Sequence, residues 1–344
     1  MVTILDVARQ VGVSKATVSN VLNSKGRVSE ATKKAVFKAI EELDYRPNVL
    51  AQSLSKQVSD TIGLLIPSGY HTSRYITRLI DMTQELANKA GKFLMITQVD
   101  GNDIELGIQS IRKLIDRRCD GIIYYKSSHI EEIDIQNKLE TLIEELPVPL
   151  VVLNYNLPNK PDYCVWFDHV AIAQLAVVNL IERGHKKIAY ISGQQHMHTS
   201  RARLQGYQDA MKKAGLELNS RLIAGGSDSH YQGGYDACKK LIKRELDFSA
   251  ICCYSDAMAI GALKALKENG ISVPEDVSIF GLDNDYVGDF MDPPISSIDV
   301  PVDDIISIAG KLLLEHMQNK LPTSKSNSLT GQLVHRKSVK DIID

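Results

Sequence analysis

From residue 61 onward, apolar segments of strand length alternate with amphipathic segments of helix length, and this alternation restricts the possible folds more than any other feature. It is typical of parallel sheets that carry helices on both faces. The stretch is too long for one open sheet, so we expect two lobes of α/β structure, each a doubly wound parallel sheet. Ligands of such sheets bind beyond the carboxyl ends of the strands, which predicts a site in the cleft between the lobes. The predicted strands are 62–67, 93–97, 121–125, 149–153, 187–192, 250–253 and 277–280, and the predicted helices are 75–90, 103–117, 135–145, 171–183, 201–214, 231–244, 257–269 and 302–318.

Residues 3–23 predict two short helices joined by a turn. The turn contains Gly12, which reaches backbone angles that larger residues resist, and Ser14, a favourable N-cap for the second helix. Two such helices are typical of a helix-turn-helix, whose second helix enters the major groove of DNA. The apolar positions at helical spacing are Ile4, Val7, Ala8, Val11, Val18, Val21 and Leu22, and the positions that should face outward on the second helix are Lys15, Ala16, Ser19 and Asn20.

The charge of the chain separates this all-α head from the rest. Residues 1–58 hold nine Lys or Arg and five Asp or Glu, a net charge of +4. The whole chain carries −2, so residues 59–344 carry −6. A basic module beside an acidic body is the electrostatic pattern of a DNA-binding protein.

A third helix should cover 29–43, with Ser29 as its cap and Val36, Ile40 and Leu43 on one face. Pro47 ends this helical region, because proline restricts the residue before it to extended backbone. Residues 45–59 then predict a linker with at most one or two helical turns, too short to be stable without a partner.

Several protein classes conflict with the sequence. It contains no run of 18 apolar residues that could span a membrane and no apolar signal segment at its start, so we expect a cytosolic protein. We expect neither a metal nor a cofactor, because no Cys-x-x-Cys pair or Cys/His cluster has zinc-site spacing. The five cysteines should be buried, reduced thiols: Cys119, Cys164, Cys238, Cys252 and Cys253.

Specific segments in the head, the linker and the α/β region carry a family resemblance. They are Asp6-Val7-Ala8, Gly12-Val13-Ser14, Thr17-Val18-Ser19, Tyr45-Arg46-Pro47-Asn48 with Ala51 and Leu54, Arg203-Leu204-Gln205-Gly206-Tyr207, residues 255–262 and Gly281-Leu282-Asp283-Asn284. In these segments the chain resembles the lactose/galactose repressor family, over essentially its whole length. Within the family it looks most similar to repressors of β-glucoside and galactose utilisation genes.

The resemblance implies a homodimeric repressor of carbohydrate-utilisation genes that binds a pseudo-palindromic operator and a small sugar or glycoside. Its core would resemble a two-lobed periplasmic binding protein. The implied domains are 1–44 for the helix-turn-helix, 45–59 for a hinge helix, 60–157 with 299–324 for the first lobe, and 158–298 with 325–344 for the second. The dimer face should include the first lobe and its helix 75–90. No leucine heptads follow Arg336, so we expect no tetramerising tail.

The resemblance also implies which residues of the head contact DNA. Lys15, Ala16 and Asn20 match positions that read base edges in the major groove. Most relatives have Arg at the place of Asn20. Arginine pairs with guanine and asparagine with adenine, so either Asn20 reads a different base or it contacts only the backbone. The positions that match phosphate contacts are Thr3, Ser14, Thr17, Ser19, Asn23 and Tyr45.

Leu54 matches the side chain that relatives insert into the minor groove, where such wedges separate base steps and kink the duplex. An apolar residue on a short polar linker has no core to enter, although packing against the body of the protein is the alternative. Asn48, Ala51 and Gln52 should support this hinge on DNA.

The matched ligand positions suit a sugar. Arg203 and Asp283 can together bind a pair of vicinal hydroxyls, and Trp166 or Phe167 could stack on the apolar face of a pyranose. For Arg203 the alternative is a structural ion pair with Asp283, and for Trp166 it is packing within a lobe. Asp168 and His169 flank the same site in the family, but a histidine here is more often a helix-start residue. The full set of expected ligand residues is Tyr70, Ser73, Tyr75, Asn154, Trp166, Phe167, Arg203, Ser255, Asp256 and Asp283.

Regulation would follow from a population shift, in which the ligand prefers one relation of the lobes and so alters the pairing of the two hinges. The sequence favours an inducer, with a corepressor as the alternative. The rival classes are an enzyme, which the lack of Gly-x-Ser-x-Gly, Walker and His-Glu-x-x-His motifs disfavours, and a sugar transport protein, which the basic head disfavours. A protein of the same fold that has lost ligand binding is a third.

Overall fold

A computed structural model describes residues 2–22, 26–45, 59–68, 74–100, 103–126, 133–322 and 327–342. The chain divides into two compact units, Met1–Asp60 and Thr61–Asp344, and each is described by itself. In the described part of the chain, no helix is both long and apolar enough to cross a membrane.

The described residues of the first unit form three helices: α1 (Ile4–Val11), α2 (Lys15–Leu22) and α3 (Glu30–Glu42). Gly12 ends α1 in the left-handed conformation, with φ of 71°. The hydroxyl of Ser14 accepts a hydrogen bond from the backbone N–H of Thr17 at 3.0 Å, and Ser29 caps α3 through Thr32 in the same way. The predicted turn and both caps are therefore confirmed. A small core joins the three helices, consisting of Val7, Ala8, Val18, Val21, Val36 and Ala39.

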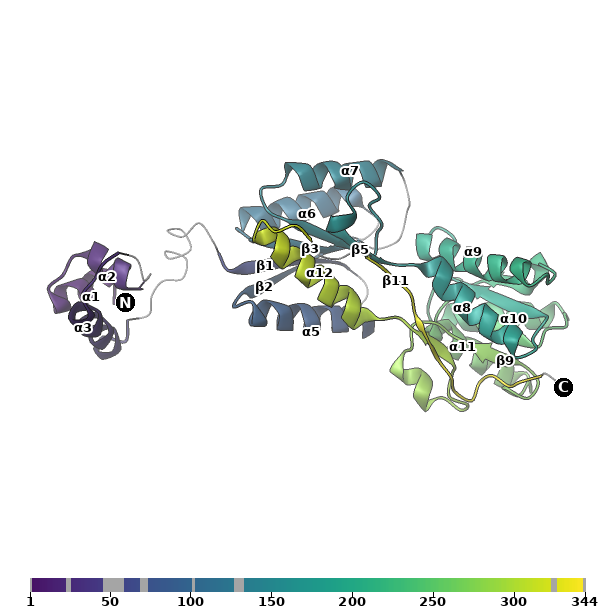
Figure 1. Ribbon diagram of the computed structural model, residues 1–344. Helices are drawn as coiled ribbons and strands as arrows, with labels where there is room; N and C mark the ends of the chain where they lie inside the picture. The colour runs from purple at the N-terminus through teal and green to yellow at the C-terminus, as the bar shows by residue number, and fades with distance from the viewer. Residues whose placement is uncertain are drawn as a thin grey trace. The chain divides into compact units, whose positions relative to one another are not determined.

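The second unit begins with a sheet of six strands. Their order is β11-β5-β4-β3-β1-β2, and every neighbouring pair is parallel. The strands are β1 (Thr61–Pro67), β2 (Phe93–Val99), β3 (Gly121–Tyr125), β4 (Leu150–Leu153), β5 (Cys164–Phe167) and β11 (Ser328–Leu329). Helices α6 (Ile104–Asp116) and α7 (Ile133–Glu145) cover one face, and α5 (Arg74–Lys89) and α12 (Val302–Met317) cover the other (Figure 1).

A second parallel sheet has the order β7-β6-β8-β9. Its strands are β6 (Ile188–Ser192), β7 (Ile223–Gly225), β8 (Ala250–Cys253) and β9 (Ser278–Phe280). Alternate residues of β8 face opposite sides: Cys252 belongs to the core that includes α8 (His169–Glu182) and α9 (His198–Lys213), and Cys253 to the core that includes α10 (Tyr231–Lys243) and α11 (Asp256–Glu268). The predicted doubly wound architecture is confirmed, and all five cysteines are buried and unpaired, as expected.

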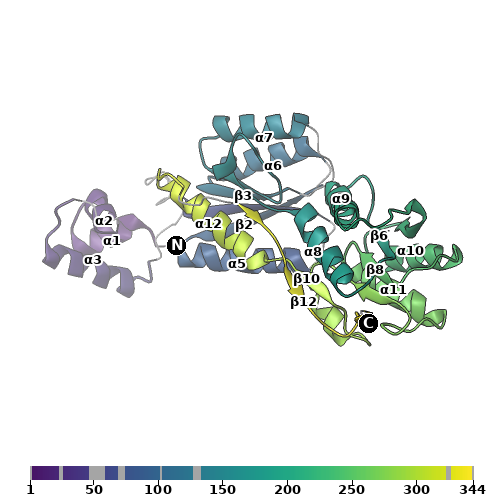
Figure 2. The ribbon, with the colours of Figure 1, turned by 45° about the vertical axis from the view of Figure 1, so that its right-hand side comes forward.

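The chain passes between the two sheets near β10 (Ser297–Asp299) and β12 (Gln332–Val334), which pair antiparallel (Figure 2). The expected lobe boundaries differ from the observed sheets. β5 and β11 lie in the first sheet, whereas boundaries at 157 and 324 assign both to the second lobe. β11 has only two residues, too few to produce a periodic pattern, and the four-residue β5 was not recognised as a strand. The described part of the second unit also contains the short 3₁₀ helices η1 (Pro161–Tyr163), η2 (Ser220–Leu222) and η3 (Tyr286–Phe290).

Candidate functional site

An ion pair between α9 and the segment after β9 forms the centre of the candidate site. Arg203 Nη2 lies 2.6 Å from Asp283 Oδ1, and Nη1 also donates to the carbonyl of Tyr254 at 2.6 Å. The guanidinium stacks over the Tyr254 ring, 4.9 Å from its centroid. Burial alone would lower the pKa of Arg203, but the Asp283 carboxylate raises it overall, so the cation persists. The side chain of Arg203 is only 6% exposed and that of Asp283 is 44% exposed, which leaves the carboxylate open to a ligand.

The loop that carries Asp283 has an unusual backbone. Asp283 and Asn284 have φ of 98° and 50°, in the left-handed region that side chains other than glycine rarely adopt. Asn284 holds the loop through hydrogen bonds on both sides: its backbone N–H donates to Ser297 and its amide to Asp299. Arg336 then donates to the Asn284 side-chain carbonyl at 2.7 Å. The surrounding structure therefore fixes the direction in which Asp283 points.

Ser255 and Asp256, two of the expected ligand residues, lie beneath this loop at the start of α11. Asp256 is 1% exposed, and its carboxylate accepts hydrogen bonds from the Ser297 hydroxyl at 2.7 Å and the Asp285 backbone N–H at 2.6 Å. Burial raises the pKa of Asp256 well above its usual range. Ser255 caps the helix by accepting from the backbone N–H of Met258. Both residues thus organise the loop from inside the protein.

Aromatic side chains from the first sheet and from its helix α5 approach the same place. The ring of Tyr75 lies 5.2 Å from that of Tyr125 and 6.0 Å from that of Phe167, measured between centroids. Burial raises the pKa of Tyr75, and the nearby charge of Asp283 raises it further. The Tyr75 hydroxyl is buried and has no hydrogen-bond partner within the described structure, and the same holds for Nε of Arg203. Such orphaned polar groups are expected where a polar ligand or water binds.

Asn154 and His169 connect the end of β4 to the start of α8. Asn154 has φ of 61°, and its Oδ1 lies 3.2 Å from His169 Nε2. Its amide nitrogen faces Tyr125 Oη and the carbonyl of Lys126. Burial lowers the pKa of His169 well below its usual range, with the charge of Arg203 as a second cause. His169 is a helix-start residue as expected, beside the N-cap Asp168, but its side chain also contacts Asn154, one of the expected ligand residues.

Trp166 is separated from these residues. Neighbouring residues of a strand point to opposite faces, and Phe167 takes the face with Tyr75. Trp166 packs partly buried in the core of the other face, the one covered by α6 and α7. The structure therefore brings Tyr75, Asn154, Phe167, Arg203 and Asp283 together and leaves Trp166 outside the group.

The helix-turn-helix exposes the surface that the sequence predicts. Lys15, Ala16 and Asn20 are exposed on α2, while Ser19 is half-buried. Some expected phosphate contacts also have local roles: Thr3 and Asp6 form a capping box, and the Ser14 and Thr17 hydroxyls lie 2.8 Å apart. Tyr45 packs against the head core. The remaining expected site residues, Asn23, Asn48, Ala51, Gln52, Leu54, Tyr70 and Ser73, lie outside the described residues.

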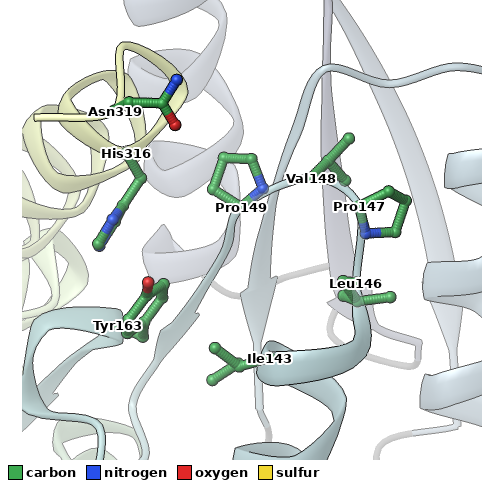
Figure 3. Close-up of a pocket in the computed structure, with 8 residues that line it drawn as sticks. All are labelled: Ile143, Leu146, Pro147, Val148, Pro149, Tyr163, His316 and Asn319. Carbon is green, nitrogen blue, oxygen red and sulfur yellow. The ribbon is translucent and has the colours of Figure 1, made fainter.

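One surface hollow of about 370 Å³ lies elsewhere, at the amino end of β4 (Figure 3). His316 of α12 stacks on Tyr163 there, with ring centroids 4.1 Å apart, and apolar residues such as Ile143 and Leu146 line the rest. The hollow contains none of the expected ligand residues. Its lining includes no carboxylate or guanidinium, in contrast to the Arg203–Asp283 site.

Two sequence signatures match the chain. "Bacterial regulatory proteins, lacI family" covers residues 3–48, and "Periplasmic binding protein-like domain" covers residues 177–339. The chain is 38% identical to the HTH-type transcriptional regulator AscG of Escherichia coli (strain K12), over 98% of both proteins. It is 34% identical to the HTH-type transcriptional regulator GalR of the same strain, over 98% of this chain and 96% of GalR.

Solved structures agree with these matches. The lac repressor dimer bound to operator and the anti-inducer ONPF superposes with a TM-score of 0.86 at 25% identity, covering 98% of this chain and 99% of the other. A complex of the transcriptional regulator CelR with cellobiose gives a TM-score of 0.70 at 28% identity, covering 98% of this chain and all of that one.

Proposed function

Because the chain belongs to the lacI family of bacterial regulatory proteins, we propose that it represses carbohydrate-utilisation genes and that a sugar inducer releases it from operator DNA. The observation that carries the proposal is the Arg203–Asp283 pair, with a half-exposed carboxylate beside an orphaned guanidinium Nε. A carboxylate and guanidinium donors together suit vicinal hydroxyls, which donate and accept at once. The cellobiose complex of a relative supports the same ligand class.

Five residues form the proposed ligand contacts: Tyr75, Asn154, Phe167, Arg203 and Asp283. Phe167 would stack on the apolar face of the sugar ring, since it shares a face with Tyr75. We propose that Ser255 and Asp256 act indirectly, because their polar atoms are already bonded within the protein. Tyr70 and Ser73 remain predictions from the sequence.

We propose that the operator is read by the exposed face of α2. Lys15, Ala16 and Asn20 would meet base edges, and Thr3, Ser14, Thr17, Ser19, Asn23 and Tyr45 would meet phosphates. The net charge of +4 over residues 1–58 supports this, since basic residues supply most of the affinity for the DNA backbone. Asn48, Ala51, Gln52 and Leu54 would form the hinge.

A second copy of the chain is the proposed partner, because a pseudo-palindromic operator requires two heads. The edge strand β2 supports a dimer surface on the first sheet: Phe93 is 67% exposed and Ile96 is 42% exposed. Apolar residues on an open strand edge favour association.

Ligand and operator are coupled in this proposal. The sugar would bind one relation of the two lobes better than the other, and operator would weaken sugar binding by the same factor. We propose cytoplasmic action, where the DNA is, and no enzymatic activity, in line with relatives that are transcriptional regulators.

A gel-shift titration tests the proposal. The full-length protein should retard the DNA upstream of its own gene and of neighbouring sugar genes, and galactose, cellobiose or methyl β-glucoside should release it. Stronger retention with sugar would favour a corepressor instead. No preference for these fragments over random duplex, with every sugar tried, would reject the proposal.

Two substitutions separate ligand contact from support of the loop. Asp283→Asn should abolish sugar release at a small cost in thermal stability, because the amide oxygen can still accept the hydrogen bond from Arg203 at this half-exposed position. Asp256→Ala should lower the melting temperature as well, because it removes two buried hydrogen bonds.

A further inference from the structure

His169 has one nitrogen that the protein uses and one that it does not. Its side chain is 9% exposed, Nε2 lies 3.2 Å from Asn154 Oδ1, and Nδ1 is buried without a hydrogen-bond partner within the described structure. The ring lies 6.1 Å from that of Phe167, between centroids, so it adjoins the proposed sugar site.

The neighbours of Asn154 determine which nitrogen of His169 carries the proton. The amide nitrogen of Asn154 faces the carbonyl of Lys126, which can only accept a hydrogen bond, and the Tyr125 hydroxyl. Its Oδ1 therefore faces His169. Because an amide oxygen only accepts, Nε2 must donate to it.

Burial and the charge of Arg203 keep the ring neutral by lowering its pKa. A neutral imidazole with its proton on Nε2 presents a bare lone pair at Nδ1. Among its described residues, the candidate site thus contains three polar groups without a hydrogen-bond partner, each of different character. Nδ1 of His169 is an acceptor, Nε of Arg203 is a donor, and the Tyr75 hydroxyl can do either.

We propose that His169 determines effector specificity by accepting a hydrogen bond at Nδ1 from one hydroxyl of the sugar. This inference rests on the proposed sugar site and adds a polar contact on the side of the α8 start. It requires the effector to carry a hydrogen-bond donor at one ring position. Sugars that lack or invert this hydroxyl would leave the buried nitrogen unpaired and would bind weakly.

Two substitutions separate the nitrogens. In His169→Gln, the side-chain amide can reach the position of Nε2 and keep the bond to Asn154 while removing the Nδ1 acceptor. In His169→Asn, a carbonyl oxygen can take the place of Nδ1. Arg203→Met is the matched control, because it removes a different contact of the same site.

The test uses the full-length protein and calorimetry. The wild type is first titrated with galactose, cellobiose and methyl β-glucoside, and then with monodeoxy forms of the sugar that binds. His169→Gln should bind the parent sugar at least tenfold more weakly than the wild type does. In the wild type, one monodeoxy form should bind more weakly than the parent sugar by the same factor. His169→Gln and the wild type should bind that monodeoxy form with equal affinity, and His169→Asn should recover most of the affinity for the parent sugar. Operator affinity without sugar should stay within twofold for every variant, which establishes that they fold.

The outcomes separate this inference from the proposed function. If His169→Gln binds the parent sugar within twofold of wild type while Arg203→Met loses it, the inference is wrong and the sugar site stands. If His169→Gln lowers the affinity for every monodeoxy form by the same factor, His169 recognises no particular hydroxyl, and the inference is again wrong. If the wild type binds no sugar of the panel, the proposed effector class fails and the inference fails with it.

Discussion

Arg336 Nη2 donates to Asn284 Oδ1 over 2.7 Å, although the two residues are 52 positions apart in the sequence. The same guanidinium also donates to the carbonyl of Ile295 at 2.8 Å and contacts the carboxylate of Asp289. A segment near the end of the chain therefore fixes the residue that follows Asp283. The orientation of Asp283 depends on a side chain outside the proposed sugar site.

Replacing Arg336, which clamps Asn284 and Ile295, should weaken binding of the effector without weakening binding of DNA. Arg336→Met leaves buried acceptors unpaired, at a cost of about 1–3 kcal/mol, and releases the Asp283 loop. We expect sugar affinity to fall about tenfold, since 1.4 kcal/mol corresponds to a factor of ten. Arg336→Lys keeps the charge but not the planar guanidinium, so its sugar affinity should lie between those of wild type and Arg336→Met. Calorimetry measures the affinity for sugar, and gel shifts measure the affinity for operator. An unchanged sugar affinity in Arg336→Met would contradict the role of Arg336 in orienting Asp283.

Gly281 has no room for a side chain. A Cβ there would lie 1.9 Å from Oδ1 of Asp256, whose position is fixed by two hydrogen bonds. Gly281→Ala should destabilise the second unit by roughly 1–3 kcal/mol, as overpacking does. Gly225→Ala is the control, because a Cβ at Gly225 meets nothing within 4 Å and should change stability by less than about 1 kcal/mol. Equal urea midpoints for the two variants would contradict the packing at Gly281.

Asn20 should read a base and not only the DNA backbone. It is exposed on α2, on the face that the helix-turn-helix presents outward. Asn20→Ala should cost about 1–3 kcal/mol at one base pair and relax the preference there. Binding to a set of operators that differ at single positions measures this preference. A uniform loss over all of them would instead indicate a phosphate contact.

The contribution of His185 to stability should fall as the pH drops below neutrality. Burial lowers the pKa of His185, whose nitrogens lie 2.9 Å from Ser249 Oγ and 3.1 Å from the Lys340 carbonyl. The unfolded histidine titrates at about 6.5, so below this pH the histidine binds more protons in the unfolded chain than in the native one. This residue should therefore lower the melting temperature at pH 5.5 relative to pH 7.5.

His185→Gln isolates this effect. The raised pKa of Asp256 acts in the opposite direction and the lowered pKa of His169 acts in the same one, so the change in wild type alone has several sources. Between pH 7.5 and pH 5.5 the change in melting temperature should be more negative in wild type than in His185→Gln. An identical change would mean that His185 does not contribute.

Long apolar runs made most of the fold predictable. The strands at 121–125 and 250–253 have the predicted bounds, because four or five consecutive buried residues flanked by turns leave little choice. Helix starts were less accurate. The helix predicted from 171 begins at His169, where Asp168 caps it through the backbone N–H of Ala171.

Residues of the candidate site could be predicted only where they lie in a recognisable sequence motif. Arg203 and Asp283 could be named because each lies in a characteristic segment, and the ion pair between them agrees with the alternative weighed for Arg203. Trp166 and Phe167 were treated alike because β5 was not recognised as a strand. Had it been, alternation alone would have allowed only one of them at the site. Nothing in the sequence signals the role of Arg336, since its partners are distant along the chain.

The placement of Trp166 has a practical consequence. It is the one tryptophan of the chain, and its backbone N–H donates to the carbonyl of Asn327, beside the paired strands β5 and β11. Fluorescence excited selectively at tryptophan therefore originates at a crossing between the two sheets. A shift in the emission wavelength on adding sugar would report a rearrangement at that crossing. It would not report stacking of the sugar on the indole ring, because Trp166 lies outside the proposed ligand contacts.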